Sequence, residues 1–143
     1  MKKVYVNEEW CLGCHLCEYH CAYANSGCKD MVYALKDKEI FPRVTVEGAD
    51  KITFAVSCRH CENPLCISAC ISGALEKTAD GVVTIDRNKC VGCGSCVMMC
   101  PYGAVEISSE HVATKCELCT KNGFGSPACV SHCPNGAIVF EER

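Results

Sequence analysis

The chain has 143 residues, 17 of them cysteine, and a formal net charge of −3. Cysteine makes up about 12% of the chain, and without it only about 37% of the residues are ordinary hydrophobic ones, which is little for one core of this size. The length excludes a dinucleotide-binding domain joined to a substrate domain, and no apolar run reaches the roughly 18 residues of a membrane span, so we expect one compact, soluble unit.

Short strands and short helices alternate along the chain. Runs of β-branched and aromatic residues predict strands at 4–6, 43–47, 52–56, 82–85, 104–107, 111–114 and 137–140. The turn signal at 79–81 predicts a hairpin over 75–85. Short helices are predicted near 17–24, 64–71, 96–100 and 127–133, each following a cysteine loop. This alternation predicts an α+β fold.

Sixteen of the cysteines form four groups of four. The first and third groups have the spacing C-x2-C-x2-C-x3-C, and the second and fourth are the same unit with a longer middle loop. A Gly-Ala-apolar pattern follows the last cysteine of three groups, so the unit is an internal repeat. In chain order the groups are Cys11, Cys14, Cys17 and Cys21; Cys58, Cys61, Cys66 and Cys70; Cys90, Cys93, Cys96 and Cys100; and Cys116, Cys119, Cys129 and Cys133.

Metal binding explains these groups better than disulfides do. The cysteine count is odd, and the charged opening at 1–9 does not fit a secretory signal, so we expect a reducing cytosol. Zinc also binds C-x2-C pairs, but it has no use for the third and fourth cysteine of each group. The spacing therefore favours four [4Fe–4S] clusters, and at about −2 per cluster the loaded chain would carry about −11. Such a charge disfavours nucleic acid and favours docking on a basic patch of a partner protein.

The spacing has a chemical reason. An x2 gap lets one tight loop present successive sulfurs to neighbouring irons, while backbone N–H groups point at the cluster. We expect the x3 gap to place the last cysteine on the first turn of a helix, aimed at a different cluster.

The order of the groups resembles that of the four-cluster ferredoxin-type subunits that carry electrons for dimethyl sulfoxide reductase, formate dehydrogenase and formate hydrogenlyase. The C-x-x-P-x-C element at 61–66 and the fourth-group segments 115–119 and 125–134 carry this resemblance. The opening at 11–18 is most similar to the ferredoxin associated with anaerobic nickel–iron carbon monoxide dehydrogenase. The resemblance implies tandem bacterial ferredoxin-like modules, each with two [4Fe–4S] clusters.

The resemblance also implies which cysteines share a cluster. The first group would pair with the fourth and the second with the third, since the fourth cysteine of a run ligates the other cluster of its pair. Cluster 1 would then be held by Cys11, Cys14, Cys17 and Cys133; cluster 2 by Cys58, Cys61, Cys66 and Cys100; cluster 3 by Cys90, Cys93, Cys96 and Cys70; and cluster 4 by Cys116, Cys119, Cys129 and Cys21.

We expect one compact unit of two interleaved modules. Module A would comprise 1–28 with 111–143, and module B 52–110. The insert 29–51 either faces a partner or is a plain structural insertion. Cys28 has no place in the ligand scheme, so it is either a buried or surface thiol, or an alternative ligand or redox-interface contact.

Other polar residues lie among the ligands. Histidines such as His60 are expected beside the clusters or at the surface, because each cluster already has four thiolates. Lys89, Arg59 and Lys115, each beside a ligand, either raise a cluster's potential or stay solvated, and we expect the second.

These features predict a non-catalytic electron-transfer subunit, since the sequence contains four one-electron centres and no flavin or nicotinamide fold. By resemblance the donor would be carbon monoxide dehydrogenase, and the acceptor a membrane hydrogenase or a pyridine-nucleotide-reducing flavoprotein. A molybdopterin enzyme of the formate dehydrogenase kind is the alternative partner. Hypotheses from other classes are a zinc-binding scaffold and an enzyme with an open iron at one cluster. The complete set of cysteine ligands argues against the second of these. We expect a cytoplasmic protein that reaches the inner membrane face only through a partner, without direct membrane insertion.

Overall fold

The computed structural model describes residues 1–36, 40–122 and 125–143. Short helices and strands alternate along it, as predicted, and the α+β fold class is confirmed. In chain order the elements are β1 (Lys3–Val6), α1 (Leu16–Ala24), α2 (Met31–Leu35), β2 (Val44–Ala49), β3 (Ile52–Ser57), α3 (Leu65–Ala69), β4 (Leu75–Lys77), β5 (Val83–Ile85), α4 (Ser95–Met99), β6 (Val105–Ile107), β7 (Ala113–Lys115), α5 (Ala128–Ser131) and β8 (Ile138–Glu141).

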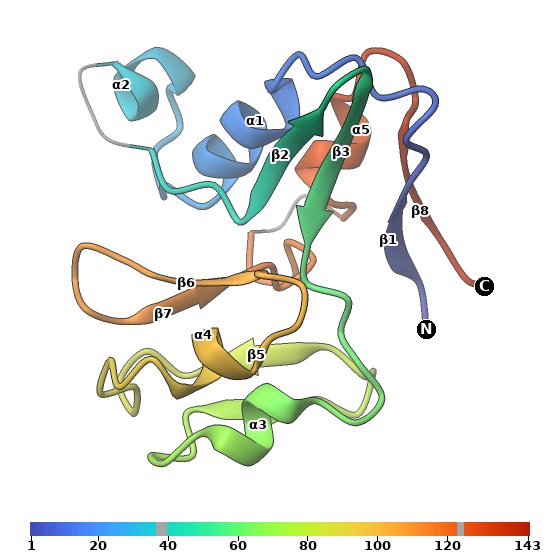
Figure 1. Ribbon diagram of the computed structural model, residues 1–143. Coiled ribbons are helices and arrows are strands. Elements are labelled where there is room, and N and C mark those ends of the chain that lie inside the picture. Colours follow the sequence, from blue (N-terminus) through green and yellow to red (C-terminus); the bar gives the residue numbers. More distant parts are fainter. Residues whose placement is uncertain (37–39, 123–124) are drawn as a thin grey trace.

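Within the described residues the strands form four two-stranded antiparallel sheets. Three of them are hairpins of consecutive strands: β2–β3, β4–β5 and β6–β7. The fourth sheet joins the two ends of the chain, with Lys3 of β1 opposite Glu141 of β8 and Val6 opposite Ile138, so the termini lie close together (Figure 1).

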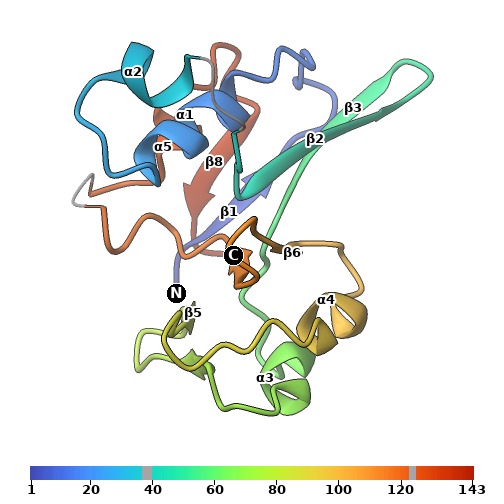
Figure 2. The same cartoon turned by 90° about the vertical axis from the view of Figure 1, so that its left-hand side faces the viewer.

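The elements gather in two halves, one above the other in Figures 1 and 2. The upper half contains α1, α2, α5 and the sheets β1–β8 and β2–β3, and the lower half contains α3, α4 and the hairpins β4–β5 and β6–β7. Helix α1 packs against α5, and α3 packs against α4. The first cysteine group therefore meets the fourth, and the second meets the third.

Each half has its own small core, built from cysteine and aliphatic residues. In the upper half Cys17, Cys21 and Cys129 are buried with Val44, Ala55 and Ile138. In the lower half Cys96 is buried with Leu75, Val83, Ile85, Val105 and Ala113. None of the described Phe, Tyr and Trp side chains is buried, so the interior lacks the large rings that fill most cores.

The internal repeat is visible in the two hairpins of the lower half. Gly81 donates its N–H to the Thr78 carbonyl at 2.9 Å, and His111 donates to the Ser108 carbonyl at the same distance. Both donors have left-handed backbones, with φ of 86° at Gly81 and 58° at His111. Glycine adopts this conformation without strain and explains the predicted turn at 79–81.

The structure differs from the predicted organisation in two ways. Helix α2 was not predicted, although the Asp30 carboxylate caps it by accepting from the N–H groups of Val32 and Tyr33. The expected module boundaries at 51/52 and 110/111 each fall between two strands of one hairpin, because β2 pairs with β3 and β6 pairs with β7. Part of the insert, residues 37–39, lies outside the described residues. No helix in the described ranges combines the length and apolarity needed to cross a membrane.

Candidate iron–sulfur sites

All four C-x2-C loops share one backbone conformation. The residue before the second cysteine has a left-handed backbone in every group, with φ of 66° at Gly13, 45° at His60, 70° at Gly92 and 56° at Leu118. A left-handed residue in such a turn makes successive N–H groups converge on a concavity that suits an anion. At His60 and Leu118 this conformation costs about 1–3 kcal/mol each, so the surrounding structure must impose it. In the sequence, a glycine at this position indicates the left-handed conformation in the first and third loops only.

A helix follows each loop at a fixed position. The third cysteine of every group is the second residue of its helix: Cys17 in α1, Cys66 in α3, Cys96 in α4 and Cys129 in α5. The fourth cysteine lies four residues on, at or just past the helix end in three groups, rather than on the first turn as expected. The reason is that an x3 gap spans about one full helical turn.

Backbone N–H groups approach several of the cysteine sulfurs. Within the C-x2-C loops, His60 donates to Cys58 at 3.5 Å and Leu118 donates to Cys116 at 3.4 Å. Such bonds stabilise a thiolate and tune a bound cluster. The remaining donors come from outside the loops: Arg43 to Cys21 at 3.2 Å, Ala74 to Cys70 at 3.2 Å and Ala113 to Cys90 at 3.4 Å.

In the upper half, cysteines of the first and fourth groups surround one another. Burial is the main cause that raises the pKa of Cys129, and the thiols of Cys116, Cys21, Cys119 and Cys17 raise it further. Burial also raises the pKa of Cys21, to which Cys119 adds. Cys133 packs against the same buried cluster.

The lower half combines the second and third groups in the same way. Burial raises the pKa of Cys66, and the thiols of Cys58 and Cys100 add to this effect. Hydrogen bonding to Ser95 lowers the pKa of Cys93, and the thiol of Cys70 opposes it. The structure thus places the fourth cysteine of each lower group near sulfurs of the other group.

Cys28 stands apart from the sixteen. It is half-buried between α1 and α2, where its N–H donates to the Ser26 hydroxyl at 3.2 Å. Its carboxyl-terminal neighbour Lys29 accepts a hydrogen bond from the Tyr23 hydroxyl at 2.8 Å through its carbonyl. The backbone contacts of this loop explain its course without a metal.

The donor set fits iron–sulfur clusters. Among the described residues no three His, Cys, Asp or Glu side chains are close enough to hold one metal ion, although nine of the sixteen cysteines lie in or against the two cores. His60 gives a second indication, because it is 1% exposed and its Nδ1 accepts the Val83 N–H at 3.0 Å. The proton therefore lies on Nε2, which is buried without a partner in the described structure. A cluster sulfur beside the 58–61 loop would supply the missing acceptor.

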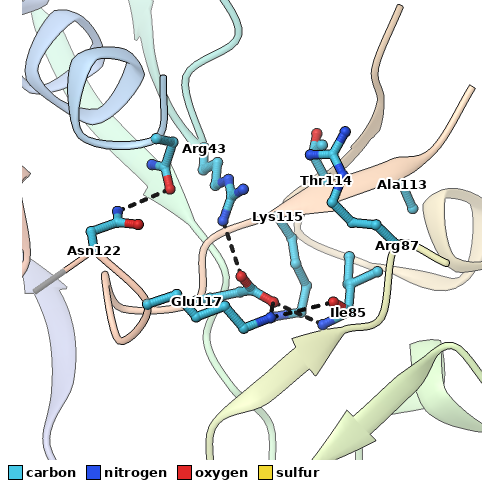
Figure 3. Close-up of a pocket in the computed structure, with 10 residues that line it drawn as sticks. Arg43, Ile85, Arg87, Ala113, Thr114, Lys115, Glu117 and Asn122 are labelled. Atoms are coloured by element: carbon cyan, nitrogen blue, oxygen red, sulfur yellow. Dashed lines mark hydrogen bonds and ion pairs between the residues drawn. The ribbon is translucent and has the colours of Figure 1, made fainter. Parts of the chain in front are cut away.

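The two halves meet at a polar junction around Glu117 (Figure 3). Its carboxylate, 9% exposed, accepts the Ile85 N–H at 2.8 Å and bonds to Arg43 and Lys121 at 3.2 Å each. Burial acts to raise the pKa of Glu117, but the Ile85 hydrogen bond and the charges of Lys121 and Arg43 outweigh it and lower that pKa. These residues line a cavity of about 180 Å³. No sequence pattern indicated this role for Glu117.

Burial at the junction also corrects the expectation for Lys115. This lysine is 1% exposed rather than solvated. Its Nζ donates to the carbonyl oxygens of Val83 and, at 2.8 Å, Cys116. His60 is neutral beside it, because burial and then the Lys115 charge lower the pKa of His60 to about 3.

Four repeats of one ligand loop and helix, arranged as two pairs, define a protein of the multi-cluster ferredoxin class. Residues 49–143 match the family described as 4Fe-4S dicluster domain, and the chain belongs to this family. Its cofactors are four [4Fe–4S] clusters.

Known relatives support the same class. The chain is 40% identical to an iron-sulfur protein of Rhodospirillum rubrum, over 94% of this chain and 79% of that protein. It is 34% identical to the thiosulfate reductase electron transfer subunit PhsB of Salmonella typhi, over 94% and 72%. It is 38% identical to the putative oxidoreductase UacF of Escherichia coli, over 90% of this chain but 19% of that protein. The chain is therefore an iron–sulfur electron-transfer protein whose relatives include subunits of redox complexes.

Proposed function

We propose that this chain relays electrons from carbon monoxide dehydrogenase to a hydrogenase or a pyridine-nucleotide-reducing flavoprotein, without catalysing a reaction itself. The similarity of 11–18 to the ferredoxin of carbon monoxide dehydrogenase supports this donor. The bound clusters supply reversible one-electron storage. The chain positions them, shields them from water and sets their surroundings.

We propose swapped ligand sets, in which the fourth cysteine of each group ligates the other cluster of its pair. Cluster 2 (Cys58, Cys61, Cys66, Cys100), cluster 3 (Cys90, Cys93, Cys96, Cys70) and cluster 4 (Cys116, Cys119, Cys129, Cys21) each draw their last ligand from the partner group. The interactions of Cys66 with Cys100, Cys93 with Cys70, and Cys21 with Cys119 support these three sets. For cluster 1 (Cys11, Cys14, Cys17, Cys133) the support is that Cys133 packs on the core that contains Cys17.

The observation that carries the relay is the continuity of sulfur neighbours across the molecule. Cys17 interacts with Cys129 inside the upper half, and Cys116 interacts with Cys58 across the junction. We therefore propose the order cluster 1, cluster 4, cluster 2, cluster 3. Cys14 and Cys93 are the exposed cysteines of the sixteen, and they belong to the first and last clusters of this order. Electrons would enter and leave beside them.

Paired cysteine variants test the ligand sets. Cys133→Ala should remove the same paramagnetic resonance signal of the reduced protein as Cys14→Ala, since both hold cluster 1. Cys21→Ala should match Cys119→Ala, and the control Cys28→Ala should retain about sixteen irons for four clusters. The swap is wrong if Cys133→Ala removes the signal that Cys119→Ala removes.

Anaerobic co-purification tests the partner. A nickel-containing dehydrogenase that is retained by this chain and reduces it in the presence of carbon monoxide supports the proposed donor. Retention of a molybdopterin protein that reduces it in the presence of formate would replace this donor by the alternative one. The electron-transfer role itself fails if the anaerobically purified chain is colourless and contains zinc instead of iron.

A further inference from the structure

Lys115 is a buried cation at the junction between the two halves. It is the last residue of β7 and directly precedes the ligand Cys116. Its side chain is among the largest that are fully buried in the described structure, at 1% exposure. The two hydrogen bonds of its Nζ go to main-chain carbonyls, those of Val83 and Cys116. These oxygens carry partial charge only, so they do not neutralise the ammonium group.

No ion pair joins Lys115 to a carboxylate anywhere in residues 1–36, 40–122 and 125–143. The nearby carboxylate of Glu117 is paired instead with Arg43 and Lys121. The neighbouring His60, whose Nδ1 accepts from the Val83 N–H, offers no negative charge whether its imidazole is neutral or protonated. A buried charge without an opposite charge is strongly unfavourable, so an anion other than a carboxylate must compensate Lys115.

Lys115 is hydrogen-bonded to segments that contain cluster ligands in both halves. On one side its Nζ donates to the carbonyl of Cys116 at 2.8 Å. On the other side it donates to the carbonyl of Val83, whose own N–H donates to Nδ1 of His60 in the 58–61 loop. Cys116 is a ligand of cluster 4, and the 58–61 loop begins and ends with ligands of cluster 2. The same ammonium group therefore lies within electrostatic reach of two clusters that each carry about −2 with their thiolates.

We propose that Lys115 is the shared counter-ion of clusters 2 and 4, a positioning residue that raises both reduction potentials and eases electron transfer across the junction. The inference rests on the proposed ligand sets. The step that it assists moves one electron and neither makes nor breaks a bond, so one side is oxidised by one electron and the other reduced by one. A fixed positive charge between two anionic sites stabilises the added electron on either side.

The chain contains a matched control for this proposal. Lys89 precedes the ligand Cys90 as Lys115 precedes Cys116, so both lysines have the same place in the repeat. The Lys89 side chain, however, is 52% exposed and pairs with Glu76 at 3.3 Å. Solvent and a carboxylate thus screen its charge, whereas the Lys115 charge is unscreened.

The test is an anaerobic redox titration of the full, cluster-loaded chain, followed by electron paramagnetic resonance. In Lys115→Met, the one-electron reduction equilibrium of two of the four clusters should weaken about tenfold, which is 59 mV. The other two clusters should keep their potentials, and Lys89→Met should change every equilibrium less than twofold. Lys115→Arg, which keeps the charge, should retain the wild-type potentials.

Several results would overturn the proposal. Unchanged potentials in Lys115→Met, an equal shift of all four, or an equal effect of Lys89→Met would each do so. A Lys115→Arg protein that loads about sixteen irons yet behaves like Lys115→Met would show that charge is not the cause. If Lys115→Met loses cluster 4, the potential of cluster 2 still tests the proposal. Lys115→Gln, which is also uncharged at this position but keeps an N–H donor for the carbonyls, provides a second variant for the same measurement. A wild-type chain without iron would instead contradict the electron-transfer role.

Discussion

Glu117 should be the side chain on which the joining of the two halves depends most. It connects Ile85 of β5 in the lower half with Arg43, which leads into β2 of the upper half (Figure 3). Replacing it by alanine leaves the buried Ile85 N–H without an acceptor, at a cost of about 1–3 kcal/mol. It also leaves the Arg43 guanidinium, 18% exposed, without its carboxylate. Because a buried ion pair is broken, the total loss of stability expected for Glu117→Ala is about 3–5 kcal/mol.

The assay is the rate at which the visible iron–sulfur absorbance disappears under anaerobic conditions at a fixed guanidinium concentration. Because separation of the halves exposes the clusters, the loss of about 3–5 kcal/mol should accelerate bleaching about 100- to 4,000-fold. Glu117→Gln keeps an acceptor for the Ile85 N–H and should fall between Glu117→Ala and the wild type.

Glu110 provides the control for this variant. It also pairs with an arginine, Arg87, at 2.5 Å, but its side chain is 72% exposed. Such a surface pair contributes about 0–1 kcal/mol, so Glu110→Ala should bleach at most a few times faster than the wild type. Equal bleaching rates for Glu117→Ala and Glu110→Ala would refute the assignment of the junction to Glu117.

Folding lowers the pKa of Glu117, so the stability that its carboxylate contributes is present above the pKa of the unfolded chain and is lost as the pH falls through the pKa of the folded chain. The bleaching rates of the wild type and Glu117→Gln should therefore converge in acid. A constant ratio of the two rates down to the lowest pH would contradict this. Gly92→Ala should lower the cluster content of the protein more than Gly94→Ala. Both glycines have a positive φ, but only at Gly92 would an added Cβ clash, lying 2.2 Å from the His111 carbonyl oxygen. Equal losses of cluster would mean that backbone strain alone matters. Chelation of iron should abolish cooperative unfolding in circular dichroism, since the two cores are small and more than a third of their residues are ligand cysteines. An iron-free chain that melts cooperatively would show that the aliphatic residues suffice.

Local features of the fold could be predicted from the sequence. Each predicted strand and helix lies within about two residues of an observed one, because cysteine spacing, glycine turns and β-branched runs act over a few residues. Helix α2 was missed because, unlike α3, α4 and α5, it does not follow a cysteine loop, and its one clear signal was the capping Asp30.

Features that depend on the meeting of distant segments could not be predicted. The β1–β8 sheet pairs residues from opposite ends of the chain. Glu117 reaches Ile85 and Arg43, which lie 32 and 74 positions away. Lys115 and Lys89 occupy the same place in the repeat, yet one is buried and the other exposed. Only the packing of one half against the other distinguishes them, and a repeat pattern contains no information about that packing.

The polar character of the junction has a physical explanation in the charges that it must hold. Two neighbouring clusters at about −2 each would repel one another across an apolar interface, where the effective dielectric constant is low. Among the described residues, the charged side chains that line the junction cavity are Arg43, Arg87, Lys115 and Lys121 against the single carboxylate of Glu117. In the proposed arrangement this positive excess lies between the two anionic sites. Glu117 fixes two of these cations in position and leaves Lys115 free of any carboxylate. In the relay that we propose, the interactions that join the halves thus also reduce the repulsion between the clusters, and this would make the junction a favourable place for an electron to cross.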